Sequence, residues 1–390
     1  MANIVDYLAW RGDLTFAERP FNDVDNIILS TLSYLDFSGI VPGPGEGAVT
    51  LAQASSLVLE ETEGNVDLRV RSLAKLDPNL LVKLSTSRRF GNILLHDCVD
   101  RLDVAKSLQF AALQMDVTPE RTYVSFRGTD STLVGWRENF MLSFTITEAQ
   151  REALTYLEVA LAEARSHGRK VYVGGHSKGG NLALFAALSC PADLQEVIER
   201  VWNNDGPGIS HKIISIRPRK VFGDRYKKIV PSCDMVGIIF EHDSDPRSVV
   251  ASSATGALQH DPFTWKVLPC GIEELDDLSM ESKIMRSALK TWLENVSLEE
   301  RAVLVDQFFG ALEASGAHTL FEVTESFKSM KTVLSAMGEM DSSTKELLMS
   351  LAGSMVAKTM DVAASSALHV AQAAFEELTK RPDKETEALP

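Results

Sequence analysis

Residues 175–179, Gly-His-Ser-Lys-Gly, constrain the fold more than any other part of the chain. This Gly-x-Ser-x-Gly motif directly follows a strand-like run, Val-Tyr-Val at 171–173, and precedes a helix-like run of small residues at 179–188. A nucleophile elbow requires this strand–turn–helix setting, in which a serine hydroxyl projects from the end of a sheet. The free N–H groups at the start of the helix then face any negative charge that develops nearby. The pattern therefore predicts a nucleophilic serine at Ser177. The alternative is a glycine-rich turn that binds a phosphate or nothing.

Short strand-like runs alternate with helical stretches in the first part of the chain. The runs are rich in β-branched and aromatic residues and fall at 122–126, 170–173, 199–202, 219–222 and 226–230. A helix is expected at about 148–166, because Thr147 and Gln150 have the spacing of a capping box. Such alternation predicts an α/β fold with a mostly parallel sheet that is covered by helices on both faces.

The sequence pattern changes near residue 272, from alternating strand-like and helical runs to helical runs alone. Beyond this point the sequence is rich in Ala, Met and Leu, and Ser297 with Glu300 again fits a capping box. We therefore expect an α/β domain over 1–272, a helical C-terminal region over 273–380 and a disordered tail over 381–390.

The composition excludes several classes of function. The chain carries 39 basic and 54 acidic residues, a net charge of −15, which disfavours nucleic acid and anionic membranes as partners. The four cysteines form no close pair, so neither a zinc site nor a disulfide framework is expected. No apolar run is long enough for a membrane span, and the N-terminus lacks the pattern of a signal peptide. We expect a cytoplasmic protein without a metal or cofactor.

A serine nucleophile needs a general base, which α/β-hydrolases place late in the chain, after the acid. The histidines that follow the motif are His211, His242, His260, His318 and His369. The first comes too early for an acid-bearing strand to precede it, and the last two fall in the helical region. His242 lies in an acidic, solvated turn, whereas His260 lies on a predicted loop that suits a mobile base. We therefore predict His260 as the base.

Two carboxylates are candidates for the acid that orients this histidine. Asp205 lies in the run Asn-Asn-Asp-Gly-Pro, and Asp234 lies in the run Pro-Ser-Cys-Asp-Met. Asp234 follows the strand-like run 226–230 at its C-terminal end, where open α/β sheets present functional groups. The predicted triad is therefore Ser177, Asp234 and His260, with Asp205 as the other candidate.

At this point the chain resembles class 3 lipases, and more closely a bacterial branch of lipase-like α/β-hydrolases of uncharacterised function. The resemblance covers about residues 20–270. It rests on Val-Ser-Phe-Arg-Gly-Thr-Asp at 124–130, on Gly-Gly-His-Ser-Lys-Gly-Gly-Asn-Leu-Ala at 174–183, on a Pro-x-x-Asp segment and on a late histidine. It implies an α/β-hydrolase fold that cleaves a small-molecule ester or a lipid. It also implies an oxyanion hole with donors from Thr129 and from the backbone N–H group of Lys178. In the mechanism that we expect, both donors are backbone N–H groups, and the Thr129 hydroxyl could be a third donor.

The chain departs from this family at the elbow, because class 3 lipases usually carry Leu where this chain has Lys178. The lysine could bring a positive charge to the substrate, or it could point to solvent with its stem packed. The family's lid follows the oxyanion strand, and the matching stretch 131–144 has large apolar residues at near-helical spacing. This stretch could form a lid or an ordinary helix packed on the sheet.

The C-terminal helices supply a hypothesis of a different class. The chain could be a catalytically weak or silent hydrolase module that binds a partner, or itself, through these helices, since Met is common on adaptable binding surfaces. The alternative is that the helices pack on the hydrolase and on each other.

Overall fold

The computed structural model describes residues 2–72, 76–210, 213–215, 217–239, 247–314, 318–319 and 322. Most of the expected helical region, the whole of the expected tail at 381–390, and His211, His242 and His369 lie outside these ranges. The prediction of self-association through the C-terminal helices therefore stays a prediction.

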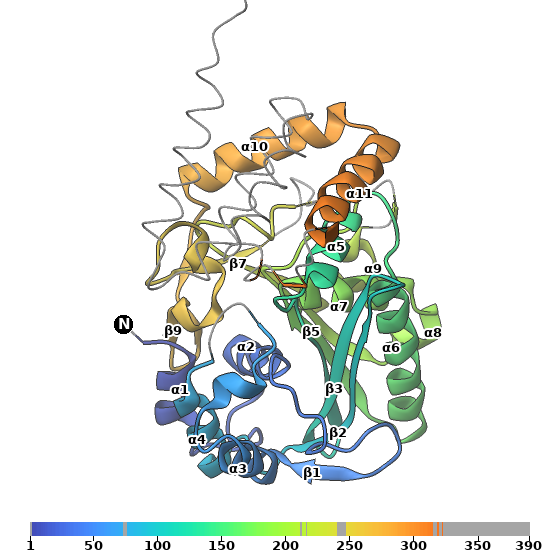
Figure 1. The fold of residues 1–390 in the computed structure, drawn as a ribbon. Helices are drawn as coiled ribbons and strands as arrows, with labels where there is room; N and C mark the ends of the chain where they lie inside the picture. Colours follow the sequence, from blue (N-terminus) through green and yellow to red (C-terminus); the bar gives the residue numbers. More distant parts are fainter. Residues whose placement is uncertain are drawn as a thin grey trace, which may run out of the picture.

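A nine-stranded sheet, in the order β1-β2-β3-β4-β5-β6-β7-β8-β11, forms the centre of the described structure (Figure 1). Its strands are β1 (Ala48–Thr50), β2 (Leu94–Asp103), β3 (Leu108–Thr118), β4 (Arg121–Phe126), β5 (Lys170–His176), β6 (Ile198–Asn204), β7 (Tyr226–Pro231), β8 (Ser248–Val250) and β11 (Glu274–Leu275). Strands β4 to β8 run parallel, and the strands outside them pair antiparallel. A separate hairpin joins β9 (Val267–Leu268) to β10 (Gly271–Ile272).

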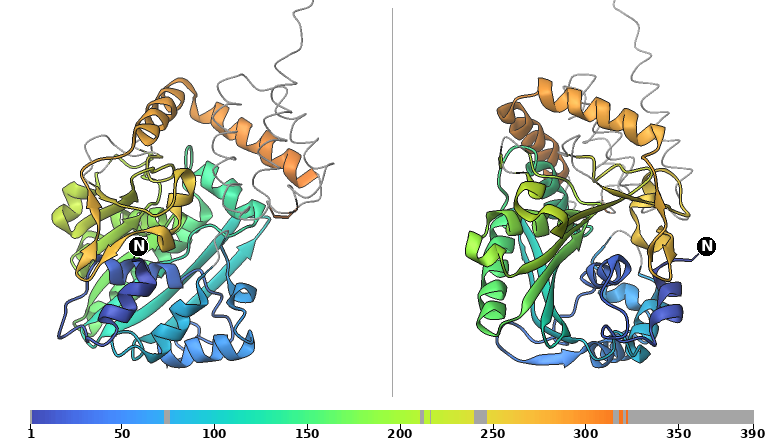
Figure 2. Two further views of the ribbon diagram at one scale, coloured as in Figure 1. Left: turned by 90° about the vertical axis from the view of Figure 1, so that its left-hand side faces the viewer. Right: turned by 180° about the vertical axis from the view of Figure 1, so that it is seen from behind.

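Helices cover both faces of the sheet, as expected for an α/β fold (Figures 1 and 2). On one face lie α6 (Glu148–Ser166), α7 (Lys178–Ser189) and the short α8 (Ala192–Gln195), and on the other lie α1 (Ile4–Arg11), α2 (Asp23–Leu32), α3 (Leu51–Glu61) and α4 (Pro78–Thr86). Strand β4 shows the reason: Val124 packs with the first group of helices, whereas its neighbour Tyr123 packs with the second. Successive side chains of a strand point to opposite faces, so burial of both requires two helical layers.

Four of the five predicted strand runs lie in β4, β5, β6 and β7. The fifth prediction, a strand at 219–222, is wrong, because Pro218–Phe222 forms the short helix α9. Pro218 occupies the first turn, where its fixed φ angle favours a helix and its missing N–H costs nothing. The predicted capping box at Thr147 and Gln150 is present at the start of α6.

The described C-terminal helices lie across the end of the sheet at which β5 ends (Figure 1). They are α10 (Met280–Asn295) and α11 (Leu298–Ala314). Helix α11 packs against α5 (Leu133–Met141), with Val305, Phe309 and Leu312 buried against Leu133 in one apolar cluster. Ser297 and Glu300 form the expected reciprocal capping contacts before α11. Every helix in the described ranges is too short or too polar to traverse a lipid bilayer.

Candidate active site

The turn between β5 and α7 holds Ser177 in a strained backbone conformation. Its φ is 58° and its ψ is −132°, a region that residues other than glycine rarely occupy. The flanking glycines are required by close packing: a Cβ on Gly175 would lie 2.4 Å from the backbone of Gly179, and a Cβ on Gly179 would lie 2.1 Å from the carbonyl oxygen of Phe126. The backbone N–H of Ser177 donates to Asn204 O at 2.9 Å, which ties the turn to the end of β6. The sequence therefore folds here into a sharp, tightly packed elbow.

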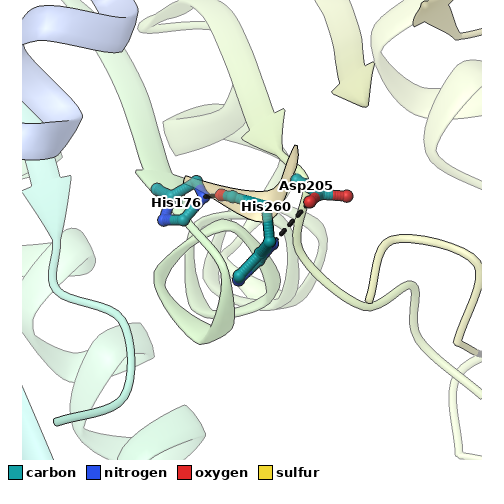
Figure 3. A group of neighbouring side chains, drawn as sticks. All are labelled: His176, Asp205 and His260. Atoms are coloured by element: carbon teal, nitrogen blue, oxygen red, sulfur yellow. Dashed lines mark hydrogen bonds and ion pairs between the residues drawn. The ribbon is translucent and has the colours of Figure 1, made fainter. Parts of the chain in front are cut away.

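The side chain of His260 connects Ser177 to a buried carboxylate. His260 Nε2 lies 3.0 Å from Ser177 Oγ, and His260 Nδ1 lies 2.5 Å from Asp205 Oδ2. Asp205 is completely buried, whereas the His260 side chain keeps 13% of its surface exposed. Figure 3 shows the His260 ring with its contact to Asp205 on one side and His176 on the other. Because a carboxylate only accepts, Nδ1 carries a hydrogen, and neutral Nε2 accepts from the serine hydroxyl.

The acid beside His260 is Asp205 and not the predicted Asp234. Asp205 follows β6, the strand next to the elbow strand, whereas Asp234 follows β7, one strand further away. Asp234 Oδ1 instead accepts from the backbone N–H of Ile238 at 3.3 Å, and its carbonyl oxygen accepts from Ser282 Oγ on α10 at 2.6 Å. Asp234 therefore stabilises its own turn and its contact with α10.

His176, which the sequence analysis did not single out, holds the loop that carries His260. Its Nε2 lies 2.8 Å from the carbonyl oxygen of His260, and its Nδ1 lies 2.8 Å from the Tyr34 hydroxyl. Burial raises the pKa of Tyr34, so this phenol keeps its proton and can donate to Nδ1. Because the His260 carbonyl can only accept, Nε2 of His176 carries a hydrogen. The sequence signal that could have pointed to this role is that His176 directly precedes Ser177.

Two further contacts fix the short 3₁₀ turn Gly256–His260. The Trp265 indole Nε1 donates to the carbonyl oxygen of Gln259 at 2.7 Å. The Gln259 side-chain oxygen accepts from Ser232 Oγ at 3.0 Å and from the Cys233 N–H at 2.9 Å. The loop expected to be mobile is thus held by hydrogen bonds at Gln259 and at the carbonyl oxygen of His260.

His176, Asp205 and His260 each offer one atom of a metal-binding type, and these atoms lie within 4.8 Å of one another. The hydrogen bonds assign these atoms other tasks. Nε2 of His176 is protonated towards a carbonyl, and Nδ1 of His260 is protonated towards Asp205. A protonated ring nitrogen has no lone pair for a metal, so the cluster fits a hydrogen-bond network better than a metal site.

The Lys178 side chain follows neither of the two courses that the sequence left open. It is 1% exposed, and its Nζ donates to Glu138 Oε2 at 2.8 Å and to the carbonyl and side-chain oxygens of Gln109 at 2.7 and 2.6 Å. The charge therefore points neither to solvent nor to the serine. It forms a buried ion pair with α5. The Lys178 backbone N–H keeps its place in the first turn of α7, where helical N–H groups lack an acceptor within the helix.

The Thr129 hydroxyl is also engaged elsewhere. It donates to Asn139 Oδ1 on α5 at 2.9 Å, which corrects the expectation of a third oxyanion donor from this side chain. Thr129 itself lies in the segment between β4 and α5, and it lines the same pocket as Ser177. Within Thr129, the backbone N–H group is therefore the remaining candidate for an oxyanion donor.

A small pocket of about 50 Å³ opens beside Ser177. Its wall includes aromatic and aliphatic side chains from several parts of the chain, together with one carboxylate: Tyr34, Leu76, Trp136, Pro262, Phe263 and Asp261. Ser177, His176 and His260 also line this pocket.

The sheet with its parallel centre, the helices on both faces and a serine on a strand–helix elbow define a lipase-like α/β-hydrolase fold. The chain belongs to the Mbeg1-like family, whose profile matches residues 84–310, more than half of the sequence. No significant relative was found among curated proteins.

Two solved lipases overlap with parts of this fold. The M37 lipase superposes with a TM-score of 0.33 at 17% identity, covering 54% of this chain and 68% of that chain. A fungal lipase in an inhibitor complex superposes with a TM-score of 0.31 at 14% identity, covering 72% of this chain and 96% of that chain. The more specific expectation of a bacterial branch stays a prediction.

Proposed function

We propose that this protein is a serine hydrolase that cleaves a carboxylic ester through an acyl-enzyme. One observation carries the proposal: Ser177, His260 and Asp205 form a continuous chain of hydrogen bonds, and the serine sits on a strained elbow that opens into a pocket. A nucleophile beside a base, with the base oriented by a buried acid, is the arrangement that activates a hydroxyl for acyl transfer.

In the acylation step, Ser177 Oγ attacks the ester carbonyl carbon while its proton passes to His260 Nε2. Asp205 keeps the imidazole oriented and stabilises the imidazolium that forms. The tetrahedral intermediate collapses with cleavage of the bond to the leaving oxygen, which takes the proton from His260 and departs as an alcohol. Water then attacks the acyl-enzyme with His260 again as base, which releases the carboxylic acid and restores the serine.

The negative charge of the intermediate develops on the former carbonyl oxygen. We assign its stabilisation to the backbone N–H groups of Thr129 and Lys178. The second of these lies in the first turn of α7, where the helix dipole adds to the effect. Loss of one such donor typically raises the barrier by about 2.7–4 kcal/mol.

The proposal is tested by labelling with a fluorophosphonate probe, using wild type beside Ser177→Ala. Wild type is expected to be labelled and to hydrolyse p-nitrophenyl acetate, and the variant is expected to lose both activities. An unlabelled, folded wild type without esterase activity would refute the proposal. Retention of full activity by Ser177→Ala would refute the assignment of the nucleophile.

A further inference from the structure

Helix α5 occupies the position of the lid in the resembled family, since it directly follows the segment with Thr129. In this chain, one side of α5 is held by contacts of Glu138 with Lys178 and Ala149. The Glu138 side chain is completely buried, and its two oxygens accept from Lys178 Nζ at 2.8 Å and from the Ala149 N–H at 2.9 Å. Lys178 directly follows the nucleophile, so α5 is tied to the elbow itself. Movement of α5 away from the elbow would leave two buried charges unpaired, which is strongly unfavourable.

Helix α11 also holds α5, through ion pairs and apolar packing. Arg137 donates to Asp306 Oδ1 at 2.6 Å and to Glu313 Oε1 at 3.1 Å. The Phe140 ring lies 5.6 Å from the Phe309 ring in the apolar cluster between the two helices. The buried Arg301 of α11 adds a bond to the carbonyl oxygen of Ser143, just beyond α5, at 2.9 Å. Helix α5 therefore lies between two partners, the elbow residue Lys178 and helix α11.

The pocket that this fixed helix helps to enclose is small. Trp136 of α5 lines this pocket together with residues of the His260 loop. Its volume of about 50 Å³ is roughly a third of the 150 Å³ cavity that accommodates benzene in an engineered protein. By this comparison, the space beside the reacting carbon accommodates about two or three non-hydrogen atoms of an acyl chain.

We infer that α5 is a fixed wall, and that the site accepts short-chain acyl esters from solution, with Trp136 setting the upper limit of chain length. This inference rests on the proposed serine hydrolase function. It assigns Lys178, at the position where the resembled lipases carry Leu, the task of locking α5 through Glu138. Because α5 stays in place, the site has no closed form that contact with a lipid–water interface could open.

The test is a chain-length profile with p-nitrophenyl acetate, butyrate and octanoate. For wild type, kcat/KM is expected to be roughly tenfold or more higher for acetate than for octanoate, since misfit in a pocket costs at least this factor. Trp136→Ala is expected to shift the preference towards octanoate, and Trp136→Leu is a milder variant should the first lose its fold. Trp10→Ala, at an exposed tryptophan of α1, is the matched control and should keep the wild-type profile.

Interfacial behaviour gives a second, independent readout. With tributyrin, the wild-type rate is expected to saturate smoothly through the solubility limit of the substrate. A preference of wild type for octanoate, a rate jump at the solubility limit, or an unchanged profile in folded Trp136 variants would overturn the inference. Failure of the proposed function looks different, because no ester of any length would then be hydrolysed and the fluorophosphonate probe would not label Ser177.

Discussion

Asp205 Oδ2 lies 2.5 Å from Nδ1 of His260, and no part of the Asp205 side chain reaches solvent. The carboxylate follows β6 and occupies a left-handed backbone conformation with φ 48°. Its other oxygen, Oδ1, accepts from the Gly237 N–H at 3.3 Å. The acid is thus held by its own strand end and by the neighbouring turn, which fixes the orientation of the imidazole.

Replacement of this acid should impair turnover far more than substrate binding. We expect Asp205→Asn to lower kcat by about 10⁴-fold with little change in KM, because the amide favours the wrong imidazole tautomer. Steady-state kinetics on p-nitrophenyl acetate measure the effect. Asp234→Asn is the comparison, and its loss should be far smaller because Asp234 contacts Ile238 and α10 rather than His260. An inactive, folded Asp234→Asn beside an active Asp205→Asn would reverse the assignment.

Loss of the Tyr34 hydroxyl should loosen the position of the base. Tyr34→Phe removes the hydrogen bond to His176 Nδ1, whose ring in turn holds the carbonyl of His260. A single hydrogen bond contributes about 1 kcal/mol, so we expect about a fivefold lower kcat. KM and the melting temperature should change little, which distinguishes a positioning effect from unfolding. A kcat equal to that of wild type would show that His176 does not need Tyr34.

The buried ion pair beneath α5 should show strong thermodynamic coupling. Lys178→Met leaves the Glu138 carboxylate buried without its cation, and such a loss typically costs about 3–5 kcal/mol in the free energy of unfolding. The double variant Lys178→Met/Glu138→Leu replaces both charges and should recover most of this loss. Urea denaturation of both single variants and of the double variant measures the coupling. Additive losses would contradict a direct, buried interaction.

Stability should also depend on pH through His96, which lies at the bulge of β2. Burial alone would lower its pKa, but hydrogen bonds with Asp116 and Asp97 raise the pKa of His96 to about 9. The distances are 3.2 Å from Nε2 to Asp116 and 3.0 Å from Nδ1 to Asp97. A pKa above the unfolded value means that the stabilisation is complete below about pH 6.5 and is lost as the pH rises through about 9.

The measurement is the urea midpoint of wild type and His96→Gln at pH 6 and pH 9.5. The advantage of wild type over the variant should shrink over this interval by an amount on the order of 2 kcal/mol. The carboxylate partner behaves in the opposite sense: its bonds with His96 and Arg169 outweigh burial and lower the pKa of Asp116 to about 2. Its contribution is present above about pH 4 and is lost as the pH falls towards about 2. A pH-independent difference between wild type and His96→Gln would contradict the ion-pair assignment.

Local sequence features predicted the elements that local sterics control. The glycines around Ser177 have no alternative, since a Cβ at Gly175 or Gly179 would collide with backbone. The β-branched and aromatic residues of strand β4 and the capping residues Thr147 and Gln150 likewise act within a few residues. Such features can be inferred without knowledge of distant contacts. The strand expected at 219–222 is wrong because Pro218 favours the start of a helix, which outweighs the β-type residues Val221 and Phe222.

The choice of acid depends on tertiary structure. Asp205 and Asp234 both follow parallel strands, both precede His260 and both are completely buried. The difference arises from strand order, because β6 lies beside β5 whereas β7 does not. Nothing in the spacing along the chain shows which of the two strand ends the His260 loop reaches.

The sequence by itself determined the α/β architecture and the elbow that presents Ser177, because glycine sterics and hydrophobic periodicity are local. Only the tertiary structure decided that Asp205 contacts His260, that His176 holds the His260 loop and that Lys178 pairs with Glu138. These three contacts join residues that lie 40 to 84 positions apart in the chain. Their energies come from the burial of charged and polar groups, which exists only after the sheet and its helices have assembled.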